Sequence, residues 1–207
     1  MLFRSQSSTF KDNSTNAFTI TRNGDTAVNS VNPFQNNGTY SMYFDGTGDY
    51  LTTPASPSMY FGAGDFTIEF WMYQVVSTGA QYLVAQNSGT VSTSQFDINV
   101  NNGALAAVLY YGASYLASAT TTITTGTWTY ITLVRSTTTA TLYKNGSSVG
   151  TIAISTNTLN SPTTAVTVGS IAGGTYPFNG YITDLRITKY ARYTTTFTPP
   201  TSTFQTK

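Results

Sequence analysis

The sequence contains neither cysteine nor histidine. Without cysteine there is no disulfide framework and no thiolate metal site. Without histidine the chain lacks the commonest general base and the commonest ligand of transition metals. These absences exclude catalytic groups built on a Ser–His–Asp triad or a Cys–His pair.

Charge is also scarce. Charged residues make up 8% of the 207 residues, against about 25% in an average soluble domain, and the formal net charge is +1. No basic stripe is present, so nothing favours nucleic acid as a partner. The apolar runs are too short to span a bilayer, and the first residues lack the apolar core of a signal peptide. We therefore expect no membrane insertion and no export by a cleaved signal within this chain.

Hydrophobic residues, at 40%, and aromatic residues, at 14%, are sufficient for a sizeable core. They recur with a period of two, as in residues 66–73, where Phe, Ile and Met alternate with Thr, Glu and aromatic residues. Asn-Gly pairs at 102–103 and 145–146 each separate two such runs and predict tight hairpins. No segment favours a helix. The pattern predicts an all-β protein built as an antiparallel sandwich or barrel.

Composition suggests three parts. Residues 36–193 have no internal break and are expected to form one sandwich. Residues 1–35 are polar and aperiodic, with one short strand expected at 18–21, and are read as an arm that packs on the body or on a partner. Residues 194–207 contain Pro199-Pro200 and are read as an extended tail.

Four stretches in order resemble the laminin-G-like, concanavalin A-like jelly-roll family. They are residues 43–51 (YFDGTGDYL), 65–73 (DFTIEFWMY), 128–135 with 140–146 (WTYITLVR and ATLYKNG), and 178–187 (FNGYITDLRI). The resemblance covers most of the chain and implies a two-sheet antiparallel jelly-roll sandwich. It does not fix a function, because this sandwich hosts enzymes, lectins and scaffolds.

A narrower resemblance concerns the flanks. Residues 16–25, 187–193 and 197–200 are similar to segments that flank this domain in structural proteins of tailed bacteriophages, especially cyanophages. It implies a virion protein, either a capsid decoration or a tail-fibre module, assembled in the host cytoplasm. The implied partners are other virion proteins of the capsid or tail.

Catalysis is not expected. Glycoside hydrolases use a pair of carboxylates. In the resembled family both would lie on one strand face, whereas here the matching strand offers Glu69 alone, with Thr67 and Trp71 at the alternate positions.

Calcium is a candidate ligand near the turn at 46–48. Asp45 and Asp49 flank this turn, and carboxylate oxygens suit a hard cation. The family resemblance adds Asp184, because the first and last strands are often neighbours there and some members hold a structural calcium. The alternative is that Asp45 caps the turn and Asp184 bonds to backbone.

Sugar binding is suggested by aromatic residues expected in loops and at a hairpin end. Aromatic faces stack on pyranose rings, while amides and carboxylates bind the hydroxyls. The candidate residues are Glu69, Tyr110, Tyr111, Tyr115 and Tyr176. The alternative is that these tyrosines are half-buried packing at the rim.

Assembly anchors are expected in the polar arm, because buried aromatic residues dominate the energetics of interfaces. Phe3, Phe10 and Phe34 are the candidates. The alternative is that they fold back on their own sandwich.

The sequence therefore favours a non-catalytic virion structural protein that displays a lectin-like jelly roll, with host-surface glycans as further partners. The alternative is a free, extracellular carbohydrate-binding module or lectin, with or without calcium. A degenerate glycosidase is the third reading. Composition leaves the oligomeric state open between a monomer and a symmetric homo-oligomer.

Overall fold

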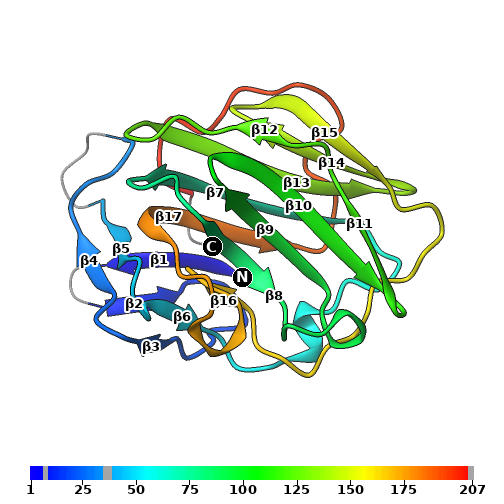
Figure 1. The fold of residues 1–207 in the computed structure, drawn as a ribbon, viewed down its shortest axis with the longest axis horizontal. Coiled ribbons are helices and arrows are strands. Elements are labelled where there is room, and N and C mark those ends of the chain that lie inside the picture. The colour runs from blue at the N-terminus through cyan, green and yellow to red at the C-terminus, as the bar shows by residue number, and fades with distance from the viewer. Residues whose placement is uncertain (7–8, 35–38, 205–207) are drawn as a thin grey trace.

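Two antiparallel β-sheets packed face to face form the protein (Figure 1). The computed structural model describes residues 1–6, 9–34 and 39–204, with the side chains of residues 3–6 outside the description. The predicted all-β jelly-roll sandwich is confirmed. Among the described residues, helix is limited to three single turns: η1 (Pro57–Met59), η2 (Val91–Thr93) and η3 (Ala172–Gly174). None of these could cross a membrane.

Sheet A has the order β15-β14-β13-β7-β17-β1-β2, with β5 also paired to β17 and β4 paired to β5. Its strands are β1 (Leu2–Gln6), β2 (Thr9–Asp12), β4 (Ala27–Asn29), β5 (Ser41–Asp45), β7 (Phe66–Gln74), β13 (Trp128–Ser136), β14 (Thr139–Lys144), β15 (Ser147–Ala153) and β17 (Asn179–Thr188).

Sheet B has the order β11-β10-β9-β8-β16-β6-β3, with β12 paired to β10. Its strands are β3 (Thr21–Asn23), β6 (Tyr50–Thr52), β8 (Ala80–Gln86), β9 (Phe96–Asn101), β10 (Ala104–Tyr111), β11 (Ser114–Ala117), β12 (Thr121–Thr122) and β16 (Thr167–Val168). In Figure 1, β8, β9 and β10 lie in front of the strands of sheet A.

The core lies between the sheets because alternate side chains of each strand point inward. Phe66, Ile68, Phe70 and Met72 of β7 are fully buried and belong to the same hydrophobic cluster as Phe96, Ile98 and Val100 of β9. The intervening residues of these two strands face outward, and three of them are nevertheless fully buried: Thr67 and the two carboxylates Glu69 and Asp97.

Both predicted Asn-Gly hairpins are confirmed. Asn102 and Gly103, with φ of 49° and 78°, join β9 to β10, and Asn145 and Gly146, with φ of 50° and 78°, join β14 to β15. Positive φ at both central residues is the requirement of a type I′ turn. At Gly146 there is a second reason for glycine, since a Cβ there would overlap the carbonyl oxygen of Phe197.

The first 34 residues contribute strands to both sheets. β1 pairs with β17, β2 pairs with β1, and β4 pairs with β5, while β3 pairs with β6 of the other sheet. The prediction of a short strand at 18–21 is wrong, because β-sheet pairing in this segment begins only at Thr21. Phe18 and Ile20 instead pack half-buried against the core.

The last described residues, 194–204, have no regular structure and reach the outer face of sheet A. Phe197 stacks on Tyr193, with ring centroids 3.7 Å apart, and its amide donates to the carbonyl of Gly146 at 3.1 Å. Phe204 is buried with Tyr130 and Leu2 in a small second hydrophobic cluster. This tail therefore covers side chains of sheet A that would otherwise meet solvent.

Candidate functional site

The outer face of sheet B carries a fully buried carboxylate, Asp97 of β9. Its Oδ2 accepts hydrogen bonds from the Tyr110 hydroxyl at 2.7 Å and from Asn87 Nδ2 at 2.9 Å, and its Oδ1 accepts from Asn99 Nδ2 at 2.6 Å. All three donors are neutral. Burial therefore raises the pKa of Asp97, and the three hydrogen bonds offset only part of the rise.

Two pairs of tyrosines flank this carboxylate. Tyr110 of β10 lies opposite Tyr115 of β11, with ring centroids 6.0 Å apart, and Tyr82 of β8 contacts Tyr176 at 5.5 Å. Tyr115 is 58% exposed and Tyr176 48%. Burial and then the nearby Asp97 charge raise the pKa of Tyr82 to about 12, and the same two causes raise the pKa of Tyr110. Both hydroxyls therefore stay protonated at neutral pH.

The structure brings three of the predicted sugar-binding tyrosines to this face: Tyr110, Tyr115 and Tyr176. It does not bring Tyr111, which follows Tyr110 in the strand, points to the other side of sheet B and packs half-buried against the core. The arrangement can offer aromatic faces at two sides and the amide of Asn99 between them. The sequence reading missed Asn87, Asn99 and Tyr82 as members of this site. The strict alternation of β9 was the signal that could have placed Asn99 beside Asp97.

The structure does not support Glu69 as a sugar-binding residue beside the tyrosines, because it lies in sheet A and is fully buried. Its Oε2 accepts from the hydroxyls of Tyr130 at 2.6 Å and Tyr193 at 3.0 Å, while its Oε1 accepts from Arg186 Nε at 2.7 Å and lies 3.4 Å from Arg192 Nε. The carboxylate is thus saturated by its own chain and is not available to a sugar hydroxyl beside the tyrosines of sheet B.

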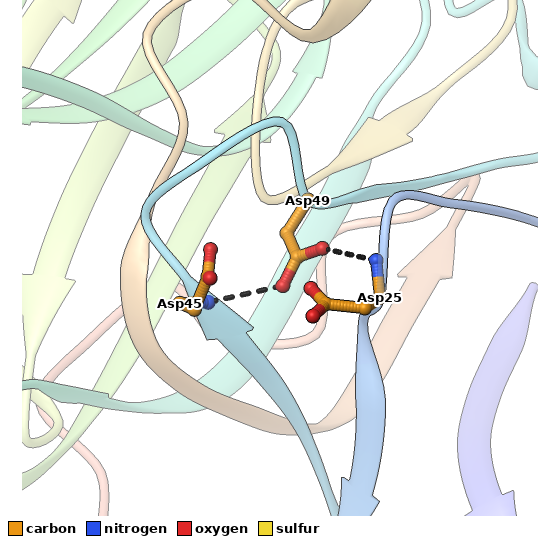
Figure 2. Close-up of side chains that lie close together, drawn as sticks. All are labelled: Asp25, Asp45 and Asp49. Atoms are coloured by element: carbon orange, nitrogen blue, oxygen red, sulfur yellow. Dashed lines mark hydrogen bonds between the residues drawn. The ribbon is translucent and has the colours of Figure 1, made fainter.

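Three aspartates meet at the turn between β5 and β6 (Figure 2). Asp49 is fully buried, and its two oxygens accept from the backbone N–H of Asp25 at 2.8 Å and of Asp45 at 3.0 Å. One oxygen from each of the three carboxylates lies within 4.8 Å of the others. Burial raises the pKa of Asp49. This set could supply part of the oxygen shell of calcium, and it also ties the turn at Gly24 to the turn at 46–48.

Asp184, the expected third ligand of the candidate calcium site, does not lie near Asp45 and Asp49. Asp184 lies five residues further along β17 than Asn179, the partner of Asp45, which places it on the order of 15 Å away at the rise of a strand. It occupies a bulge with φ of 52°, and it accepts a hydrogen bond from the backbone N–H of Phe204 at 2.8 Å. Asp25 takes its place, and Asp45 also caps its own turn by accepting from Thr47 N at 2.6 Å.

The predicted anchors pack on their own chain where their side chains are described. Phe10 contacts the main core, and Phe34 meets Trp71 edge-on with ring centroids 6.1 Å apart. Phe3 pairs through its backbone with Leu185, but its side chain lies outside the described residues.

Comparison with known proteins agrees with this architecture. A family model described as the concanavalin A-like lectin/glucanases superfamily, Laminin_G_3, matches residues 45–195. The chain belongs to this superfamily. The earlier resemblance is thereby confirmed for the fold and the family. No curated protein matches the chain.

Solved structures with the same fold include domains of bacterial toxins. The receptor-binding domain of botulinum neurotoxin D has a TM-score of 0.74 at 13% identity, over 93% of this chain and 49% of that chain. The binding domain of Paraclostridial Mosquitocidal Protein 1 gives 0.71 at 17%, over 93% and 49%. The binding domain of botulinum neurotoxin DC, solved in complex with SialylT, gives 0.69 at 15%, over 92% and 48%. This lectin-like domain thus spans about half of each of them.

Proposed function

We propose that this concanavalin A-like domain is a non-catalytic carbohydrate-binding module whose ligand lies on the outer face of sheet B, above Asp97. The observation that carries the proposal is the pair of exposed rings, Tyr115 and Tyr176, which belong to two tyrosine pairs around one network of amides. Aromatic faces stack on the apolar side of a pyranose, and amides bind its hydroxyls.

In this site Asp97 acts on the ligand through its neighbours. Being fully buried, it holds the Asn99 amide and the Tyr110 hydroxyl in fixed orientations, and each keeps further hydrogen-bonding capacity for a sugar. Groups fixed in advance lose less entropy on binding. The buried negative charge disfavours an anionic ligand directly above it, so a neutral hexose is the expected class.

The structural relatives support binding rather than a reaction. They are binding or receptor-binding domains, and one of them was solved with SialylT. Those statements concern whole domains of which this chain spans about half, so for this chain they support a lectin-like role without defining the ligand.

Glycan-array screening followed by calorimetry on the best neutral glycan tests the proposal. Replacing both Tyr115 and Tyr176 by alanine should weaken binding about tenfold or more, since each ring supplies stacking of roughly 0.5–1.5 kcal/mol. Val75→Ala is the control, because Val75 is similarly exposed at 46% but follows β7 of the other sheet. Equal losses in the two proteins, or no binding to any neutral glycan, would refute this site.

We further propose that the module is carried on the virion of a tailed phage, as a capsid decoration or tail-fibre part assembled in the host cytoplasm. The support is the resemblance of residues 16–25, 187–193 and 197–200 to segments of such proteins. Cryo-electron microscopy of native particles tests it. Ordered copies of this chain on a capsid or fibre are expected, whereas its absence from particles would favour a free extracellular lectin.

A further inference from the structure

A pocket separate from the site above Asp97 lies beside sheet A, between the start of β1, residues 13–15 and the C-terminal part of β17. Its volume is about 340 Å³, which is within the range of small-ligand sites and suits one sugar residue. The side chains that matter here are Asn13, Ser14, Thr15, Arg186, Tyr190 and Arg192. None of them belongs to the site above Asp97.

Two arginines in this pocket share one counter-charge. Arg186 Nε and Arg192 Nε both face Oε1 of the buried Glu69, at 2.7 Å and 3.4 Å. Their side chains are 19% and 24% exposed, and no hydrogen bond from a terminal Nη of either is found within the described residues. The nearby Asp12 is occupied by the backbone of residues 2, 14 and 18 and by the Ser14 hydroxyl. The outward edges of both guanidinium groups therefore remain as donors.

Both guanidinium groups are held in place by aromatic rings. The Arg186 Cζ lies 3.6 Å from the centre of the Phe204 ring, and the Arg192 Cζ lies 4.7 Å from the centre of the Tyr190 ring. Stacking of this kind fixes the plane of a guanidinium and leaves its edges free for bidentate recognition of a carboxylate. The two guanidinium groups are therefore preorganised for ligand binding.

The remaining lining also points to an acceptor-rich ligand. Among the residues that the structure describes, the Nδ2 of Asn13 is buried without a hydrogen-bond partner, so another donor lies unused beside the arginines. The hydroxyls of Ser14 and Thr15 border the pocket, and the exposed ring of Tyr190 offers an apolar face. Unused donors, two positive charges and one ring match a sugar that carries an acidic group.

We propose that this pocket binds a carboxylate-bearing sugar, such as a sialic or a uronic acid, with its carboxylate against Arg186 and Arg192 and its ring against Tyr190. The sugar class rests on the proposed carbohydrate-binding function, but the surface is separate from that of sheet B. The two sites therefore divide by charge, with neutral sugars above Asp97 and acidic sugars at the arginines.

Calorimetry of the full chain with sialyllactose, lactose, glucuronic acid and inorganic phosphate tests this assignment. We expect sialyllactose or glucuronic acid to bind more tightly than lactose, with an affinity that falls as salt is added. Arg192→Gln should weaken the acidic sugar about tenfold, because a charge-assisted hydrogen bond is lost. Tyr190→Ala, a change at an exposed ring that leaves the fold intact, should weaken it about fivefold.

Lys189→Gln is the matched control, since it removes the same charge three residues before Arg192, at a position that does not line this pocket, and it should leave binding unchanged. An equal loss in Lys189→Gln and Arg192→Gln, or phosphate binding as tightly as the acidic sugars, would overturn the assignment. Acidic-sugar binding that survives the Tyr115/Tyr176 double replacement would support this pocket even if no neutral glycan bound to sheet B.

Discussion

Glu69 and Asp97 are both fully buried carboxylates on the outward-facing positions of their sheets, and they differ in what surrounds them. Glu69 faces two arginines and accepts hydrogen bonds from the hydroxyls of Tyr130 and Tyr193. Within the described part of the chain, the hydrogen-bond partners of Asp97 are all neutral. A buried charge without a counter-ion lowers stability, and such charges gather at functional sites. The contrast indicates a structural role for Glu69, and it is consistent with the binding role that we propose for Asp97.

The largest expected effect separates these two roles directly. Glu69→Gln leaves two arginines without their counter-charge, and breaking a buried ion pair costs about 3 kcal/mol or more of the free energy of unfolding. Asp97→Asn leaves no cation without its counter-charge, so it should lower the free energy of unfolding by about 1 kcal/mol at neutral pH. Urea denaturation of both variants measures the difference. Similar losses in the two proteins would remove the distinction between a structural and a binding role.

A second effect concerns the tail, which packs on sheet A. Gly146 and Gly103 have the same φ of 78° in equivalent Asn-Gly turns, so alanine at either position is strained by about 1 kcal/mol. Only at Gly146 does the new methyl group overlap Phe197, because at Gly103 the nearest atom is 3.8 Å away. Gly146→Ala should therefore lose about 1 kcal/mol more than Gly103→Ala.

Hydrogen exchange of residues 194–204 provides the second measurement for this pair. Exchange of the tail should accelerate in Gly146→Ala, since the Phe197 N–H then loses its bond to the Gly146 carbonyl, and should be unaffected in Gly103→Ala. Equal stability and equal exchange in both variants would mean that the tail contributes nothing to sheet A.

The smallest effect is the pH dependence at Asp97. Its pKa is raised in the folded state, so its relative contribution to stability is present below the unfolded pKa of about 4 and is lost as the pH rises through the folded pKa. Asp97→Asn removes this dependence. The stability of the variant relative to the wild type should therefore increase as the pH rises from about 4 toward neutrality. A constant difference between their unfolding free energies over that range would contradict the raised pKa.

The sequence predicted those parts of the fold that have local signals. Alternation placed the inward residues of β7 and β9, and the Asn-Gly pairs placed two hairpins. The sites depended on contacts between distant segments. Asp25 reaches Asp49 from a turn 24 residues upstream, and Tyr193, whose hydroxyl donates to Glu69, lies 124 residues after it. Neither contact leaves a periodic or compositional trace.

The position of β17 also affects how the chain is made. It is the last strand, and it pairs with β7, β5 and β1, whose partner Leu2 lies at the start of the sequence. At a synthesis rate of roughly 5–20 residues per second, about 10–35 seconds separate β1 from β17 on the ribosome. Until β17 emerges, β1 has only β2 to pair with, and the edge of β7 that will pair with β17 stays open. The order of synthesis thus delays completion of sheet A until β17 has emerged.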